Sequence, residues 1–328
     1  MPDPNRPLFT PEQLLEGWTP RRVGRRVITL AQTDSTNNVV LASSGDPDAD
    51  GLAVFADYQT AGRGRQGRTW LAPRGASILC SILLRSSGER ASNPPAIPGG
   101  RTSYLPSDSG GRASCPPRDL GGRVSCPPWE GRGDAVTSKH GDQDNRPPEL
   151  TDDSGRLTLA SAVAVCEAIR RSTDIVPAIK WPNDLRVAGR KLAGILIESR
   201  VIAPHTRVWV VGVGINCYQQ AGHFPPELRD AATSLDLASS HAVDRVVVAR
   251  ELLKAFDEIL GPQSAQTTEA IHAQWLAYAE PLGQHVRLRC DGREYAGRTL
   301  SVDPAGGLIL QCDDGQRRWF DPLRTSTI

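Results

Sequence analysis

Residues 180–198 read KWPNDLRVAGRKLAGILIE, two runs of residues separated by Ala188 and Gly189. Glycine adopts a positive φ without steric cost, so a glycine at this point suits a tight turn. The run after the turn is mostly apolar beyond its first two residues, Arg190 and Lys191. The stretch therefore predicts two strands joined by a tight turn, which places Lys191 on a strand.

Upstream, residues 59–70 read QTAGRGRQGRTW and directly follow the apolar run 52–58. We call residues 59–70 the arginine loop. Glycine lets the backbone approach a ligand closely, and each guanidinium offers a planar fork of donors suited to carboxylate or phosphate. The loop is therefore predicted to close over a ligand that carries both groups. Taken alone, the segment also fits a solvated or nucleic-acid-binding arginine-glycine stretch.

Two other segments carry chemical information. Residues 33–38, TDSTNN, form a cluster of hydroxyl and amide groups, and such residues favour the start of a helix because they accept hydrogen bonds from unpaired backbone N–H groups. Residues 208–213 are apolar on both faces, as in a central strand covered by helices, and they run into Gly212-Val213-Gly214-Ile215-Asn216.

The rest of the chain predicts helices followed by a small barrel. An apolar stripe with a spacing of three to four residues predicts a helix over 157–170 that packs Cys166 into a core. The tail from Gly283 alternates short β-prone runs with glycine turns. Further elements are expected as a short helix within 8–24, a strand over 76–84, helices over 244–260 and 267–278, and a first barrel strand near 282–286.

Residues 86–155 differ sharply in composition from their surroundings. Proline, glycine, serine and aspartate dominate, and periodic apolar residues are missing. Such a segment buries too little apolar surface to offset the entropy lost on ordering. We predict a disordered surface insert between the strand 76–84 and the helix 157–170.

Bulk composition limits the function classes. The 328 residues include 38 Lys plus Arg and 37 Asp plus Glu, so no overall field steers the chain toward nucleic acid or an anionic membrane. The seven cysteines form no CxxC pair, which argues against zinc and thioredoxin-type sites. No stretch approaches the roughly 18 apolar residues of a membrane span. We expect a protein of the reducing cytoplasm.

These four motif segments, in this order, resemble the biotin protein ligase family, in a form without an amino-terminal DNA-binding domain. The resemblance covers most of the chain apart from residues 86–155 and roughly the first twenty. It implies an α+β fold, with a mixed sheet flanked by helices as in class II synthetases, and a small carboxy-terminal SH3-like β-barrel. The implied domains are an extension (1–24), a catalytic domain (25–279) interrupted by the insert, and the barrel (280–328).

The resemblance also implies a reaction. Biotin and ATP would form biotinyl-5'-AMP and pyrophosphate, and an acceptor lysine of the biotin carboxyl carrier protein of acetyl-CoA carboxylase, or of a related carboxylase, would then be modified. Implied catalytic residues are Arg65, Lys191 and Asp184, with Mg²⁺ at Asp184. The implied biotin-binding residues are Ser35, Thr36, Asn37, Gln59, Arg63, Gly64, Arg65, Lys191 and Gly194, and the implied ATP-binding residues are Arg65, Arg68, Trp70, Asn183, Lys191 and Asn216.

Other interpretations remain open. A lipoate-protein ligase shares the fold and the adenylation chemistry, and a relative that binds ligand without catalysis would keep the pocket. Asp184 either contacts Mg²⁺ or orients the incoming lysine. We expect no nucleic-acid partner, because the 33–38 cluster begins too early to leave room for a winged-helix reader. We also expect no membrane partner, and the resemblance allows a homodimer formed through sheet edges.

Overall fold

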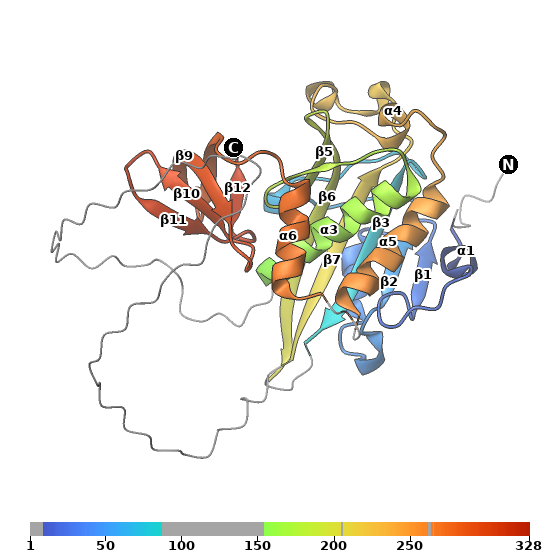
Figure 1. Cartoon of the computed structure of the whole chain (residues 1–328). Coiled ribbons are helices and arrows are strands. Elements are labelled where there is room, and N and C mark those ends of the chain that lie inside the picture. Colours follow the sequence, from blue (N-terminus) through green and yellow to red (C-terminus); the bar gives the residue numbers. More distant parts are fainter. Residues whose placement is uncertain (1–8, 87–153, 205, 262–263, 265) are drawn as a thin grey trace, which may run out of the picture. The chain divides into compact units, whose positions relative to one another are not determined.

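The computed structural model describes residues 9–86, 154–204, 206–261, 264 and 266–328 (Figure 1). Nearly all of the predicted insert at 86–155 lies outside these residues, so its disorder stays a prediction. Within the described residues, no helix is both long and apolar enough to cross a membrane.

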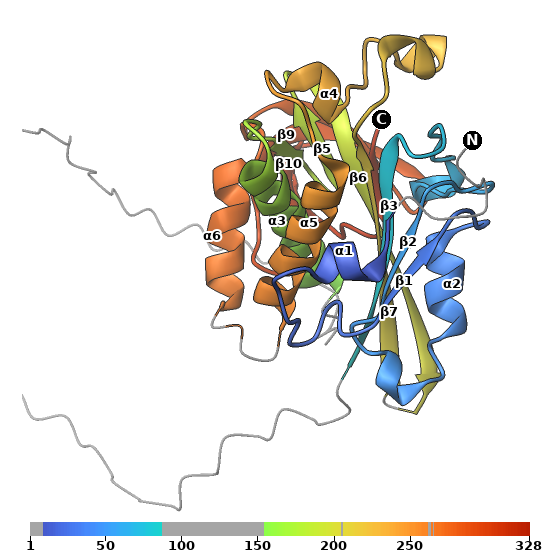
Figure 2. The same ribbon diagram turned by 90° about the vertical axis from the view of Figure 1, so that its right-hand side faces the viewer.

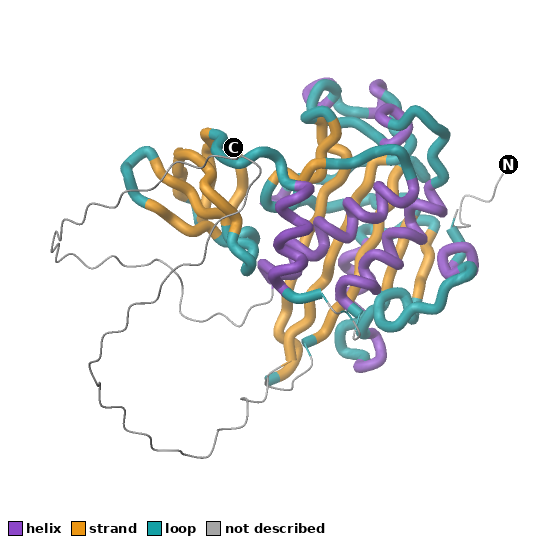
Figure 3. The backbone as a smooth tube through the Cα atoms, in the orientation of Figure 1, coloured by secondary structure: helices purple, strands orange, loops and turns teal. Residues whose placement is uncertain are grey.

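The larger sheet has seven strands in the order β1-β2-β3-β7-β6-β5-β4. Figure 3 draws its strands in orange beside the purple helices. Its strands are β1 (Val27–Leu30), β2 (Ala53–Ala56), β3 (Ser77–Arg85), β4 (Ala178–Lys180), β5 (Asp184–Val187), β6 (Arg190–Ala203) and β7 (Thr206–Asn216). Only β1 and β2 pair in parallel, and the other neighbours are antiparallel. The predicted mixed sheet is confirmed, and its apolar run 208–213 lies in the central strand β7.

Several helices cover one face of this sheet, and a seven-residue helix lies on the other face (Figure 2). The covered face holds α1 (Pro11–Leu15), α3 (Ser154–Ser172), α5 (Arg245–Leu260) and α6 (Thr268–Tyr278); α2 (Thr36–Ala42) lies on the opposite face, and α4 (Leu235–Ala238) follows β7. Fourteen of the nineteen residues of α3 are buried, and burial raises the pKa of the Cys166 thiol well above its usual value. Cys166 is the packing residue that its spacing predicted.

Helix α1 is shorter than the span predicted for it within residues 8–24. Thr10 caps its start, with Gln13 completing a reciprocal capping box, and Pro11 occupies the first turn. The chain leaves the helix before Gly17, whose φ of 68° is left-handed. The turn between β5 and β6 follows its prediction, since Ala188 and Gly189 both have positive φ.

The carboxy-terminal residues form a separate five-stranded antiparallel sheet. Its order is β11-β10-β9-β8-β12, with β8 (His285–Cys290), β9 (Arg293–Val302), β10 (Leu308–Cys312), β11 (Arg317–Phe320) and β12 (Thr325–Thr327). The first strand begins at His285, later than the expected 282–286. The Trp181 indole donates a hydrogen bond of 3.0 Å to the carbonyl of Gly306, which ties this sheet to the β4–β5 connection.

Asp257 on α5 anchors the segment that leads into β1. Its carboxylate accepts the backbone N–H groups of Arg21, Arg22 and Val23 at 2.8, 2.7 and 2.8 Å. The side chain is only 5 % exposed, so water does not replace these bonds readily. The carboxylate therefore fixes the amino-terminal segment against the helical layer.

Replacing Asp257 with alanine should lower the free energy of unfolding by about 3 kcal/mol, because three backbone donors lose a charged acceptor. Urea denaturation measures the change. The neighbouring Glu258→Ala is a matched control, since Glu258 forms a surface ion pair with Arg171 at 2.8 Å and should cost about 0.5 kcal/mol. Equal losses in the two variants would contradict the anchoring role.

Candidate active site

One cavity of about 390 Å³ gathers residues from distant parts of the chain. Its walls come from the arginine loop, the start of α2, the β5–β6 hairpin, the end of β7, the segment 224–232 and strand β12. Every residue that the sequence singled out lines it: Ser35, Thr36, Asn37, Gln59, Arg63, Gly64, Arg65, Arg68, Trp70, Asn183, Asp184, Lys191, Gly194 and Asn216.

The arginine loop folds back on itself. Trp70 donates its backbone N–H to Gly62 at 2.9 Å, and Gly64 donates to Arg68 at 2.6 Å. A Cβ on Gly62 would come within 2.5 Å of the Trp70 carbonyl oxygen, so the closure needs glycine at this position. The fold-back sends the three arginine side chains in different directions.

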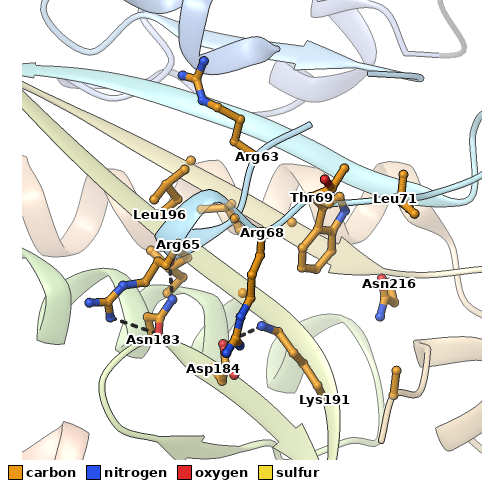
Figure 4. Close-up of a pocket in the computed structure, with 18 of the residues that line it drawn as sticks. Arg63, Arg65, Arg68, Thr69, Leu71, Asn183, Asp184, Lys191, Leu196 and Asn216 are labelled. Atoms are coloured by element: carbon orange, nitrogen blue, oxygen red, sulfur yellow. Dashed lines mark hydrogen bonds and ion pairs between the residues drawn. The ribbon is translucent and has the colours of Figure 1, made fainter. Parts of the chain in front are cut away.

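Arg65 connects the loop to two other parts of the cavity wall (Figure 4). Its guanidinium donates to the Asn183 side-chain oxygen at 3.2 Å and to the backbone carbonyls of Pro322 and Thr325, the latter at 2.7 Å. Burial lowers the pKa of Arg65 from its usual value, and the nearby carboxylates of Asp184 and Asp321 oppose that shift. No sequence motif indicates this contact with the carboxy-terminal sheet.

Arg63 points away from Arg65 and Lys191, whereas Arg68 points toward Lys191 and Asp184 (Figure 4). The Arg63 guanidinium forms an ion pair with Glu198 at 3.0 Å and donates to the Asn38 side chain at 2.7 Å. Arg63 therefore lies near the start of α2, and Arg65, Arg68 and Lys191 form the cationic end of the cavity.

Lys191 and Asp184 face each other across the hairpin. The Lys191 ammonium donates to the Asp184 carboxylate at 2.6 Å. Among the described residues, no group of three or more His, Cys, Asp or Glu side chains is placed to hold a metal ion. Asp184 thus offers a single carboxylate, which suits a cation that brings most of its ligands as water and phosphate oxygens.

The hydroxyl and amide groups at the start of α2 differ in detail from a simple helix cap. Ser35 occupies the N-cap position, but its side chain makes no capping hydrogen bond. The side-chain oxygen of Gln59 accepts the Thr36 backbone N–H at 2.7 Å instead. The cluster lies at the start of a helix as predicted, and Asp34 accepts the Ser35 backbone N–H at 2.6 Å, but the acceptor for Thr36 comes from the arginine loop. We call Ser35, Thr36, Asn37 and Gln59 the amide cluster.

Trp70 packs flat against two glycines of the central strands. A Cβ on Gly214 would come within 2.6 Å of the indole ring, and one on Gly194 within 3.2 Å. These residues pair directly across β6 and β7. The two glycines therefore leave room for Trp70, which forms an apolar wall between the cationic end and the amide cluster.

Several lining residues were not assigned a role from the sequence. Lys180 lines the cavity, burial lowers the pKa of its ammonium, and the nearby Arg186 adds to that effect. Arg186 belongs to the stretch 180–198, so this motif could have indicated Arg186 as a lining residue. Phe224, Leu228, Ser326 and Thr327 also line the cavity, and no local pattern distinguishes them. Asn216 donates to the Thr233 carbonyl at 2.9 Å, which ties it to the segment after β7.

Comparisons with known proteins agree with this arrangement. The sequence model of the biotin/lipoate A/B protein ligase family matches residues 29–97 and 135–216, and that of the biotin protein ligase C-terminal domain matches residues 282–321. A biotin–[acetyl-CoA-carboxylase] ligase of Mycobacterium tuberculosis is 29% identical over 299 residues, which cover 90% of this chain and 84% of the relative. A bifunctional ligase/repressor BirA of Bacillus subtilis is 28% identical over 298 residues, covering 91% and 73%.

Solved structures show the same fold. A biotin protein ligase from Aquifex aeolicus in complex with biotin and ATP superposes with a TM-score of 0.62 at 22% identity, covering 93% of this chain and 99% of that chain. Fold, motif order and both sequence matches agree, and together the matches span more than half of the chain. This chain belongs to the biotin/lipoate A/B protein ligase family and carries that family's biotin protein ligase C-terminal domain.

Proposed function

We propose that this protein is an ATP-dependent biotin protein ligase. It activates biotin as biotinyl-5'-AMP and transfers the biotinyl group to a lysine of a biotin carboxyl carrier protein. The observation that carries the proposal is the single cavity with a cationic end, an apolar wall at Trp70 and an amide cluster. Its Mycobacterium tuberculosis relative is named for this reaction.

The cationic end suits the first step. A biotin carboxylate oxygen attacks the α-phosphorus of ATP, a new P–O bond forms, and the bond to the β-phosphate breaks with release of pyrophosphate. Carboxylate and triphosphate repel each other, so cations held in place beforehand stabilise the transition state most. Arg65, Arg68 and Lys191 are placed for this role, and Lys180 adds a further positive charge beside them.

The opposite end suits the neutral ureido ring of biotin. That ring needs both donors and acceptors, which the side chains of the amide cluster supply. The apolar valeryl chain would lie against the Trp70 indole, which itself fills the space over Gly194 and Gly214. The carboxylate of biotin would then point toward Lys191 and Arg65.

The second step consumes the mixed anhydride. The amine of the acceptor lysine attacks the biotinyl carbonyl carbon, an amide bond forms, and AMP leaves with the electrons of the broken C–O bond. Asp184 lies next to Lys191 and can orient the incoming amine or accept its proton. Water would destroy the anhydride, so the arginine loop has a second role in excluding it.

The side-chain oxygens of the site suit Mg²⁺ only when the phosphates of the nucleotide also bind the ion. Asp184 would hold it, with the Asn183 side chain beside it, and the ion would supply charge neutralisation on the phosphates. In the described structure the Asp184 carboxylate is paired with Lys191 and the Asn183 side-chain oxygen accepts from Arg65. Each of these contacts holds the carboxylate or amide in position for the arriving nucleotide.

We further propose that the acceptor belongs to acetyl-CoA carboxylase or a related carboxylase, and that the enzyme acts in the cytoplasm without binding nucleic acid or membrane. A homodimer through a sheet edge is compatible with the fold.

A direct assay separates this function from its rivals. The protein, ATP and Mg²⁺ are incubated with biotin or lipoate and an acceptor domain, and pyrophosphate and acceptor mass are measured. We expect pyrophosphate release and a biotinyl mass increase with biotin alone. Transfer of lipoate in place of biotin would assign a lipoate-protein ligase, and ligand binding without pyrophosphate release would assign a non-catalytic relative.

Replacing Arg65 with alanine should lower the rate of adenylation by roughly a hundredfold or more, because a donor aimed at the reacting charge is lost. Any adenylate formed should also leak faster as free biotinyl-AMP. Quenched-flow adenylation and release of labelled biotinyl-AMP measure these effects. Arg293→Ala serves as control, since Arg293 is an exposed arginine of β9 outside the cavity. An unchanged adenylation rate in Arg65→Ala, with the fold intact by circular dichroism, would remove Arg65 from the mechanism.

A further inference from the structure

Glu198 joins the arginine loop to the amide cluster, although it does not line the cavity itself. It lies on β6 opposite Val210 of β7. Its carboxylate accepts the Asn37 side-chain N–H at 2.5 Å and the Arg63 guanidinium at 3.0 Å. One acidic side chain thus contacts both segments that close around the amide cluster.

The carboxylate also sets the direction of a chain of hydrogen bonds. An ionised carboxylate only accepts, so Asn37 must turn its amide nitrogen toward Glu198 and its oxygen toward Ser81. The fully buried Ser81 hydroxyl lies 2.5 Å from that oxygen and 2.6 Å from the Thr36 hydroxyl. Ser81 is the donor toward both of these oxygens and shares its one hydrogen between them, and the Thr36 hydroxyl donates to the Gln59 side-chain oxygen at 3.1 Å.

Packing keeps Asn37 in this orientation. A Cβ on Gly212 would come within 2.5 Å of the Asn37 side-chain oxygen, so the amide lies directly on the backbone of β7. At the far end of the cluster, the Gln59 oxygen accepts the Thr36 backbone N–H, which leaves the Gln59 nitrogen as a donor. The direction of the Asn37 amide therefore depends on the acceptor that Glu198 supplies, whereas the Thr36 backbone N–H sets the direction of the Gln59 amide.

The same carboxylate holds the arginine loop. Arg63 contacts Glu198 on one side and Asn38 on the other, and the Asn38 side chain in turn donates to Asp34 at 2.6 Å. Both contacts hold the Arg63 side of the arginine loop close to the start of α2. Loss of the Glu198 charge would leave only the neutral bond to Asn38.

We propose that Glu198 is a positioning residue that fixes the donor and acceptor pattern of the amide cluster and at the same time anchors the arginine loop through Arg63. The proposal rests on the function proposed above, because the cluster is taken to receive the ureido ring and the loop to cover the adenylate. The Arg63 and Glu198 side chains are each 39% exposed, so their ion pair acts by orienting the loop more than by adding stability.

Two substitutions separate the two roles. Glu198→Gln keeps an oxygen that can accept from Asn37 but removes the charge that holds Arg63. It should raise biotinyl-AMP release severalfold with little change in the KM for biotin. Glu198→Ala removes both contacts and should also raise the KM for biotin about tenfold, the effect of losing one charge-assisted hydrogen bond. The KM for ATP should change less than twofold in both variants.

A matched control comes from the carboxy-terminal sheet. Glu294 also pairs with two arginines, Arg287 and Arg289, at 2.9 and 2.7 Å, and it lies outside the cavity. Glu294→Gln should leave the KM for biotin and adenylate release at wild-type values. Arg63→Ala should reproduce Glu198→Gln, and the double variant should be no worse than either single one, since both remove the same contact.

Proteolysis without substrate tests independently whether Glu198 anchors the arginine loop. Brief trypsin digestion of the ligand-free protein, followed by mass spectrometry, measures cleavage after Arg65 and Arg68. We expect severalfold faster cleavage there in both Glu198 variants and an unchanged rate in Glu294→Gln. Glu198 variants that match Glu294→Gln in trypsin cleavage, adenylate release and KM would overturn the proposal. A wild-type protein that adenylates no biotin would overturn the proposed function, while the trypsin result would still decide whether Glu198 anchors the loop.

Discussion

The cavity brings several positive charges together before any anion has bound. Most contacts of these side chains offset the repulsion among them. Three of these cations have a neutralising or accepting partner within the chain. Lys191 is paired with Asp184, Arg63 with Glu198, and Arg65 with side-chain and backbone oxygens. Such partners keep the cations oriented and limit the cost of holding them together, so little reorganisation is left for the moment of reaction.

The sheet supplies the rigid frame for these charges. Strands β6 and β7 pair Gly194 with Gly214 and Leu196 with Gly212, which places three glycines on two neighbouring strands. Trp70 occupies the space over two of them and Asn37 rests against the third. A side chain from the arginine loop and one from helix α2 therefore meet on the backbone of β6 and β7, and any added Cβ would displace one of them.

Local sequence predicted the parts of this site that depend on local rules. The β5–β6 turn follows from Ala188-Gly189, and the start of α5 follows from Asp244, which accepts the N–H of Val246. The prediction failed where a residue distant in the sequence supplies a contact that a neighbouring residue was expected to supply. Gln59 accepts the Thr36 backbone N–H at the start of α2, where the Ser35 side chain makes no capping bond. The contact of Arg65 with residues 322 and 325 joins segments more than 250 positions apart, and no pattern in either segment indicates it.

That last contact decides what the carboxy-terminal sheet contributes to the cavity. A guanidinium has five N–H donors, and the contacts of Arg65 with Asn183, Pro322 and Thr325 use three of them. The Nε–H and one terminal N–H remain for an anion, so Arg65 can bind phosphate or carboxylate without leaving the sheet. The backbone carbonyls of Pro322 and Thr325 thus orient the guanidinium and still leave it able to bind an anion. Because Ser326 and Thr327 of β12 line the same cavity, the carboxy-terminal sheet belongs to the site as one of its walls.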